Sequence, residues 1–289
     1  MAFYYPAMAR ATTEKTVPEL GLQSEYGTAM QLDGYWRDIA RSIGFLSRLP
    51  VAAHFYEDDD LRISRFVRGF PLAGAVILVP VGLLYALLSA IGATSLMAAF
   101  AALAMQTVLT GALHEDGLSD TADGLGGGRD REHALAIMKD SRIGTYGAAA
   151  LILSFGLRAA ALAALLESLP PITAALCLPA AAAISRALLV WHWSALPPAR
   201  QDGVAAGAGQ PERAALRMAL LSGLLIAVVL VLPGLGLWAL LSALALSVLA
   251  VAAFTRWVRQ KIGGHTGDTI GAAQQICEAV VLCTLAIAA

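Results

Sequence analysis

Apolar stretches of about 20 residues recur along the chain, and short polar segments separate them. A helix needs roughly 20 mostly apolar residues to cross the hydrocarbon core of a bilayer. The pattern predicts an all-α fold, a polytopic membrane helix bundle of about seven transmembrane helices. The predicted spans are 70–91, 94–113, 147–167, 172–196, 214–232, 235–254 and 270–288. The weakest is 94–113, which is rich in Ala and ends in Gln106, Thr107 and Thr110.

The segments that connect these spans alternate in charge. Those at 92–95, 167–171 and 233–234 contain no Lys or Arg, whereas the segment before residue 70 and the connections at 114–146, 197–213 and 255–269 are basic. Basic short loops stay in the cytoplasm. Seven spans place every basic segment on one side, which predicts a cytoplasmic N-terminus, an outer C-terminus and polar loops that face the cytoplasm.

Two segments precede the first predicted span. Residues 1–34 are mixed and polar without a long apolar core, which argues against a signal peptide and predicts a flexible N-terminal tail. Residues 35–289 are then expected to form a single membrane-embedded domain. Within it, 35–50 mixes apolar residues with Arg37, Arg41 and Arg48, which is typical of an amphipathic helix on the inner membrane surface. A helix packed under the bundle is the alternative.

Composition supports a membrane protein and excludes one class of partner. Hydrophobic residues make up 58% of the chain and charged residues 14%, against roughly 25% charged residues in soluble domains. The lipid bilayer is therefore the expected surroundings. A formal net charge of −1 argues against a nucleic-acid partner. The three cysteines lie in apolar stretches and are expected to be small buried side chains.

The longest basic connection also carries the strongest candidate chemistry. Asp116, Asp120 and Asp123 are spaced i, i+4, i+7, so on a helix they lie within about 60° of one another. Three carboxylates on one stripe repel one another, and a divalent cation such as Mg²⁺ relieves that repulsion. His114 stands next to the stripe, either as a hydrogen-bonded neighbour or as a ligand.

Two further cytoplasmic segments add polar groups. In 138–147, Lys139 and Arg142 can hold phosphate, and Asp140 is a candidate ligand or proton acceptor. In 263–271, glycines permit close approach to a ligand. Asp268 there belongs to the site or, like Thr269, caps the last helix.

Charged residues also fall inside the predicted spans. Arg158 and Arg186 lie near mid-helix, and Glu278 lies two turns into the last span, four residues after Gln274. Such groups are costly in hydrocarbon and usually face the bundle interior. They either pair with one another or line a substrate cavity.

Several motifs in a fixed order resemble those of one family, the cobalamin synthases, which are adenosylcobinamide-GDP ribazoletransferases. They are FLSRLPV at 45–51, FPLAG at 70–74, TGALHEDGLSDTADG at 110–124, MKDSRIGTYG at 138–147, ISR at 184–186 and GGHTGDTIGAAQQ at 263–275. The resemblance covers nearly all of the chain from about residue 35. Family members often have an apolar residue in place of Glu115, so the resemblance assigns that residue no role.

The resemblance implies a reaction and a set of roles. Adenosylcobinamide-GDP and α-ribazole, or its 5′-phosphate, are joined, GMP is released, and Mg²⁺ is the cofactor of an inner-membrane enzyme. Whether the chain forms a homo-oligomer stays open. The metal ligands would be Asp116, Asp120 and Asp123, the catalytic residues Asp120, Asp140, Lys139 and Arg142, and the substrate-binding residues His114, Gly124, Arg129, Arg186, His265 and Asp268.

Two other functions are alternatives to this one. A CDP-alcohol phosphotransferase-like lipid synthase shares the fragment DTADG at 120–124, but the rest of its pattern is missing. A transporter would place its binding site near mid-membrane and often carries inverted repeats. Here the carboxylates lie at the predicted inner rim and no repeat is visible.

Overall fold

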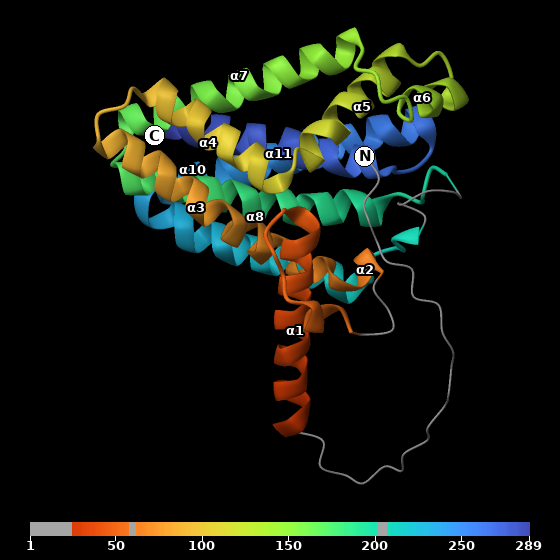
Figure 1. Ribbon diagram of the computed structural model, residues 1–289, viewed down its shortest axis with the longest axis horizontal. Helices are drawn as coiled ribbons and strands as arrows, with labels where there is room; N and C mark the ends of the chain where they lie inside the picture. The colour runs from red at the N-terminus through yellow and green to blue at the C-terminus, as the bar shows by residue number, and fades with distance from the viewer. Residues whose placement is uncertain (1–24, 58–61, 201–206) are drawn as a thin grey trace. The chain divides into compact units, whose positions relative to one another are not determined.

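A computed structural model describes residues 25–57, 62–200 and 207–289, with side chains from residue 34 onward, and all its regular elements are helices (Figure 1). One isolated bridge joins Pro198 and His265. The all-α prediction is confirmed. The elements are α1 (Glu25–Leu46), η1 (Ala53–Tyr56), α2 (Ile63–Phe66), η2 (Val67–Gly69), α3 (Phe70–Ala90), α4 (Ser95–Thr110), α5 (Leu113–Gly127), α6 (Arg131–Ile137), α7 (Thr145–Ser168), α8 (Pro171–Ala195), α10 (Arg213–Ile262) and α11 (Gly267–Ala288).

The chain divides into two compact units, Met1–Gly34 and Tyr35–Ala289. Most of the predicted flexible tail, residues 1–24, lies outside the described residues, and 25–34 form the start of α1. The rest of this description concerns the second unit.

Five stretches of this unit are long and apolar enough to cross a membrane: Ile63–Ala90, α7, α8, α10 and α11. A sixth arises when α4 and α5 are taken together across a bend of 92°. The protein is therefore a multi-pass membrane protein.

The 50-residue helix α10 is two helices that run in opposite directions. Its backbone leaves the helical region at Gly236 (φ 80°, ψ 179°). Side chains from both ends, Gln210 just before it and Arg259 near its end, donate to backbone carbonyls at the end of α8 (3.1 and 2.8 Å). Gly234, in contrast, lies against Thr173 at the start of α8. The two arms of α10 correspond to the predicted spans 214–232 and 235–254, which brings the number of crossings to about seven.

The described side chains of α1 pack against the bundle. Asp38 forms an ion pair with Arg68 of η2, and the ring of Phe45 stacks on Phe70 with 5.9 Å between centroids. Trp36 is exposed on the other side. The residues that predicted an amphipathic surface helix therefore form a helix packed against the bundle, in which Asp38 and Arg41 are buried.

A sharp turn separates α4 from α5. Gly111 (φ 64°) and Ala112 (φ 59°) both adopt left-handed backbone conformations, which end the α4 ladder. The N–H of Ala112 bonds the Thr107 carbonyl instead, at 3.0 Å. Left-handed geometry costs a non-glycine residue roughly 1–2 kcal/mol, so the fold stabilises this bend elsewhere. The bend turns the polar helix α5 away from the direction of α4 and toward α7 and α11 (Figure 1).

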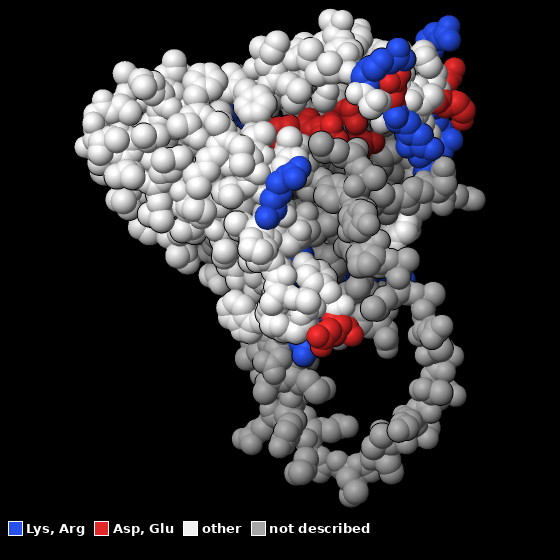
Figure 2. All heavy atoms as spheres, viewed as in Figure 1, with Lys and Arg blue, Asp and Glu red and all other residues white. Residues whose placement is uncertain are grey.

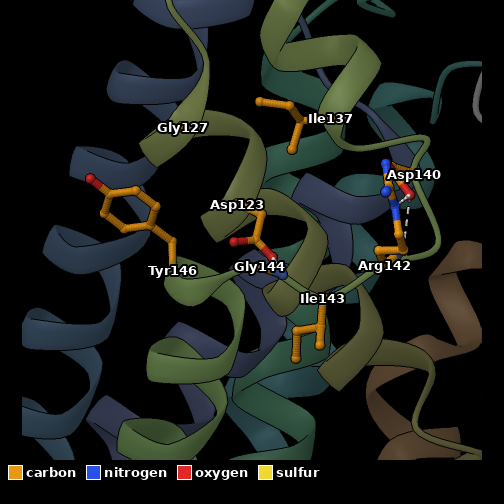
Figure 3. Close-up of a pocket in the computed structure, with 8 residues that line it drawn as sticks. All are labelled: Asp123, Gly127, Ile137, Asp140, Arg142, Ile143, Gly144 and Tyr146. Atoms are coloured by element: carbon orange, nitrogen blue, oxygen red, sulfur yellow. Dashed lines mark hydrogen bonds and ion pairs between the residues drawn. The ribbon is translucent and has the colours of Figure 1, made fainter.

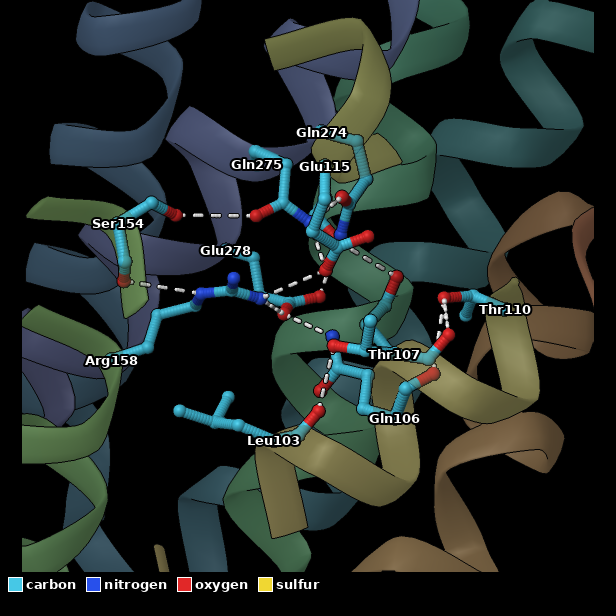
Figure 4. A network of polar contacts seen from close by, with 12 residues as sticks. Leu103, Gln106, Thr107, Thr110, Glu115, Ser154, Arg158, Gln274, Gln275 and Glu278 are labelled. Atoms are coloured by element: carbon cyan, nitrogen blue, oxygen red, sulfur yellow. Dashed lines mark hydrogen bonds and ion pairs between the residues drawn. The ribbon is translucent and has the colours of Figure 1, made fainter. Parts of the chain in front are cut away.

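A network of buried charged side chains connects the helices of the bundle (Figure 4). The two carboxylate oxygens of Glu278 on α11 each lie 3.1 Å from a guanidinium nitrogen, one of Arg158 on α7 and the other of Arg186 on α8. Gln106 of α4 donates to Glu278 Oε1 at 2.5 Å, and Glu115 of α5 lies 3.6 Å from Arg158 Nη1. All five side chains are at most 4% exposed. Two positive and two negative groups thus cancel between four helices, and the pairing alternative for the intramembrane charges is correct.

Amides and hydroxyls complete this network. Gln275 donates to Glu115 Oε1 at 3.1 Å and accepts from the Ser154 hydroxyl at 3.2 Å. Gln274 donates to Glu278 Oε2 at 2.6 Å. These bonds lower the cost of burying the charges in an apolar bundle. Among the described residues, five atoms of the network still have no hydrogen-bond partner: Gln106 Oε1, Glu115 Oε2, Arg158 Nη2, Arg186 Nε and Arg186 Nη2.

The left-handed Ala112 predicts a stabilising substitution. Ala112→Gly relieves the steric cost of φ 59° and is expected to stabilise the protein by about 1 kcal/mol. The matched control, Ala104→Gly on the exposed face of α4, should destabilise by about 0.5–1 kcal/mol. Thermal unfolding in detergent measures both. Equal destabilisation by the two substitutions would contradict the left-handed assignment.

The buried network predicts a large penalty for removing its shared carboxylate. Glu278→Ala leaves Arg158 and Arg186 without their ion-pair partner and should cost about 3–5 kcal/mol. Thr284→Ala on the same helix removes only a bond to the carbonyl one turn back and should cost about 1 kcal/mol. Denaturant titration in detergent compares the two, and similar losses would show that the charges do not carry the stability.

Candidate active site

The carboxylate stripe lies on α5 near the first residues of α7 and α11. A Cβ atom at Gly117 would lie 2.8 Å from the backbone oxygen of Asp268, so the absence of a side chain there lets α5 approach the start of α11. This places Asp116 and Asp120 beside Asp268, in the polar helix that follows the bend at Ala112. Figure 2 shows acidic and basic side chains gathered over α5 and α6, while the end with the α3–α4 turn is covered by uncharged ones.

Crowding of negative charge is the main electrostatic feature of this rim. Burial, together with the carboxylates of Asp116, Asp268 and Asp123, raises the pKa of Asp120 to about 7. A carboxyl group in this range holds a proton for part of the time at neutral pH. The rim therefore favours either a cation or a reaction that delivers a proton to Asp120.

The carboxylate of Asp123 accepts hydrogen bonds from the backbone at the start of α7, which its spacing in the sequence did not predict. Its Oδ2 accepts from the Gly144 N–H at 2.7 Å and its Oδ1 from the Gly147 N–H at 2.8 Å. These N–H groups open α7, where the helix dipole favours a negative charge. A Cβ atom at Gly144 would lie 2.5 Å from Asp123 Oδ1, so a glycine is needed for this contact. Asp123 therefore joins α5 to the start of α7.

The side chains at the rim fit a Mg²⁺ site with two carboxylate ligands, whereas the sequence predicted three. Among the residues that the structure describes, no three carboxylate, imidazole or thiolate side chains are grouped so that they could hold one metal ion. Mg²⁺ is commonly bound by one or two carboxylates together with water and substrate phosphate oxygens. Asp116 and Asp120 provide such a pair, whereas both oxygens of Asp123 already accept backbone N–H groups. The assignment of all three as metal ligands stays a prediction.

The predicted phosphate-binding residues lie on the loop between α6 and α7. Arg142 binds Asp140 through two nitrogens, with Nη2–Oδ2 at 2.6 Å and Nε–Oδ1 at 3.0 Å. The hydrogen bonds and charge of Arg142 lower the pKa of Asp140 to about 2, which makes Asp140 a weak base. Arg142 and Lys139 are both exposed at the rim. Of the two proton acceptors considered from the sequence, Asp120 is the better suited.

The residues around the start of α11 include a helix cap and a candidate site residue. Thr266 is the N-cap: its side chain accepts from the Thr269 N–H at 3.2 Å, and the Thr269 side chain accepts from the Thr266 N–H at 3.0 Å. The N-cap is thus neither Asp268 nor Thr269, although Thr269 takes part in the cap as the third residue of a capping box. Asp268 is not the cap, although it accepts from the Thr266 hydroxyl at 3.2 Å, and its charge contributes to the rim.

His265 is buried rather than open to the rim. Its backbone exchanges hydrogen bonds with Pro197 and Ala199, both at 2.8 Å, and its ring meets the edge of Trp193. Neither ring nitrogen has a hydrogen-bond partner, and burial lowers the pKa of His265 to about 4. The imidazole is therefore neutral at pH 7.

The other predicted substrate-binding residues divide between interior and surface. His114 and Arg186 are 3% and 0% exposed and lie within the bundle, close to the buried charges. Gly124 is buried under α6, where a Cβ atom would lie 2.9 Å from the Ala134 oxygen, so helix packing accounts for this glycine. Arg129 is exposed beyond the end of α5. Their roles in substrate binding stay predictions.

Two residues that position the site were missed from the sequence. Glu115 is part of the buried network, and a rotation of about 100° per residue separates it from Asp116 on α5. Helical periodicity alone places Glu115 on a different face of α5 from the three aspartates. Arg131 donates to the backbone oxygens of Ile262 and Ala199 at 3.0 and 2.5 Å, so it ties α6 to the end of α10 and to the segment that follows α8. No local pattern signals that contact.

Known proteins match this chain over almost the whole membrane unit. The family model for cobalamin-5-phosphate synthase matches residues 38–286. The chain belongs to the cobalamin-5-phosphate synthase family. It is 58% identical over 255 residues to an adenosylcobinamide-GDP ribazoletransferase of Sinorhizobium medicae (strain WSM419), covering 88% of this chain and 97% of the relative. A relative with the same name from Allorhizobium ampelinum is 55% identical over 90% of this chain and 100% of its own length.

More distant members carry the same name. One from Azorhizobium caulinodans is 48% identical over 85% of this chain and 93% of its own length. No solved structure matches the chain. The cobalamin synthase resemblance is confirmed, and these matches favour it over the lipid-synthase alternative.

The raised pKa of Asp120 predicts a pH-dependent stability. Between about pH 4 and pH 7 the folded protein keeps a proton on Asp120 that the unfolded chain has released, so the free energy of unfolding should fall as pH rises through this range. Melting temperatures in detergent at pH 5 and pH 8 measure the effect. Asp120→Asn should remove this part of the fall, and Mg²⁺ should restore stability at pH 8 in the parent protein. An unchanged pH profile in the variant would contradict the assignment.

Proposed function

We propose that this protein is an adenosylcobinamide-GDP ribazoletransferase. A ribose hydroxyl of α-ribazole, or of its 5′-phosphate, attacks the pyrophosphate of adenosylcobinamide-GDP. A phosphorus–oxygen bond to the ribose forms, the bond to GMP breaks, and the hydroxyl proton passes to a carboxylate. The observation that carries the proposal is the cluster of Asp116, Asp120 and Asp268 at the rim of a chain that matches ribazoletransferases over most of its length.

The charges of the rim suit this chemistry. Transfer of a phosphoryl-type group depends on positioning and charge neutralisation more than on covalent catalysis. Asp116 and Asp120, with Asp123 behind them, would bind Mg²⁺, and the bound ion would neutralise the negative charge of the pyrophosphate. Lys139 and Arg142 would bind phosphate oxygens from the facing loop.

Asp120 is the residue we assign to accept the hydroxyl proton. A general base works best when its pKa lies near the working pH, and without a bound cation the pKa of Asp120 lies at about 7. The carboxylate oxygen that accepts the proton would be the one that does not coordinate Mg²⁺, because a coordinated cation lowers the pKa. Asp140, whose pKa is about 2, is a much weaker base.

We further propose that the site faces the cytoplasm at the inner membrane. The carboxylate rim lies at the same end of the helices as the basic connections, including Arg129, Arg131 and Arg142. Short basic connections stay on the cytoplasmic side. Both proposed substrates are polar and charged, so an aqueous rim is where they can reach the site.

Release of GMP tests the proposal directly. Detergent-purified protein given adenosylcobinamide-GDP, α-ribazole and Mg²⁺ should release GMP, and EDTA should stop the release. Asp120→Asn should lower the rate by about 10²-fold or more, because it removes both the charge and the proton acceptor. The control Glu132→Gln changes an exposed carboxylate of α6 and should keep the parent rate. Full activity in Asp120→Asn would disprove the role of this residue.

A further inference from the structure

A pocket of about 420 Å³ opens beside the carboxylate stripe, between the end of α5, α6 and the start of α7 (Figure 3). Its volume falls in the range of small-molecule sites. A corrinoid is several times larger than a nucleoside, so the pocket suits a nucleoside-sized group. The lining residues are Asp123, Gly127, Ile137, Asp140, Arg142, Ile143, Gly144 and Tyr146.

Ile137, Ile143 and Tyr146 give this pocket an apolar part of its wall, which includes one aromatic ring. Figure 3 shows Asp123 between Tyr146 on one side and Ile137 and Ile143 on the other. Ile143 and Tyr146 are 60% and 58% exposed. The Tyr146 ring rests over Gly126, where a Cβ atom would lie 2.8 Å from its Cγ. Large apolar side chains that stay exposed at a charged, aqueous rim indicate a binding surface.

The polar groups of the pocket are already bonded to one another. Both carboxylate oxygens of Asp123 accept N–H groups of α7, and both oxygens of Asp140 accept from Arg142. A guanine base needs acceptors for its ring N–H and amino groups, and the two carboxylates could offer only the lone pairs that these bonds leave over. The pocket instead suits a flat aromatic base that carries no N–H donor.

We propose that this pocket binds the base of the acceptor, α-ribazole, and this inference rests on the proposed function. The base is a benzimidazole, which has no N–H group once it is joined to ribose. It stacks on Tyr146, as bases do on aromatic side chains, while Ile137 and Ile143 contact its edges. Because Asp123 belongs to both the pocket and the stripe, a base held here carries its ribose toward Asp120.

The aromatic base could instead come from the GDP part of the donor, and binding measurements distinguish the two sources. Calorimetry with the full-length parent protein in detergent measures Kd for α-ribazole and, separately, for adenosylcobinamide-GDP. Tyr146→Ala should weaken α-ribazole binding about tenfold, within the range that removal of one stacking ring produces. Tyr146→Phe keeps the ring and should restore most of the affinity. Ile152→Ala, on the exposed face of the same helix, is the control.

Two results would overturn the inference. One is α-ribazole binding that is absent from the parent protein or unchanged in Tyr146→Ala. The other is a loss in Tyr146→Ala that falls on adenosylcobinamide-GDP instead, which would assign the pocket to guanine. GMP release is measured on the same samples. Normal release with unchanged α-ribazole binding would reject the base pocket alone, whereas no release from a folded parent that binds α-ribazole would reject the proposed function alone.

Discussion

The cancellation of two arginines by two glutamates inside an apolar bundle is the constraint on which the rest of this structure depends. A charge without a partner costs several kcal/mol in such surroundings. Arg158, Arg186, Glu278 and Glu115 come from four different helices, and the carboxylate of Glu278 touches both guanidinium groups. The ends of these side chains can meet only when α5, α7, α8 and α11 have the correct rotation and depth. Specific pairing therefore supplies a register that uniform Ala- and Leu-rich surfaces cannot.

The reactive rim follows from this register. Glu115 faces the buried charges, so its neighbour Asp116, one residue further around α5, faces away from them. At the other end of α5, Asp123 is bonded to the start of α7. The helix is thus fixed at both ends, and Asp120, between them, is held among like charges. Those neighbours would separate if α5 were free to turn, and the bonds of Glu115 and Asp123 prevent it.

Much of this arrangement could be read from the sequence. The spans were visible as apolar stretches, and the predicted break at 233–234 lies within a few residues of the reversal at Gly236. The Asp stripe followed from helical spacing alone. Contacts between distant segments could not be read in this way. The bond of Asp123 to the Gly144 N–H depends on how α5 and α7 pack, and the left-handed turn at Ala112 occurs where local preference gives no warning.

The bend at Ala112 also has a consequence for how the chain enters the membrane. With 16 residues, α4 is about 24 Å long, less than the roughly 30 Å of the hydrocarbon core. It meets the length and hydropathy of a span only together with the polar helix α5. The insertion machinery, which reads segments one at a time, therefore receives a weak signal from α4. In the folded bundle α4 packs against α3 and α7. Its stable insertion into the bilayer therefore depends on these helix–helix contacts, so membrane insertion and tertiary folding are coupled at α4.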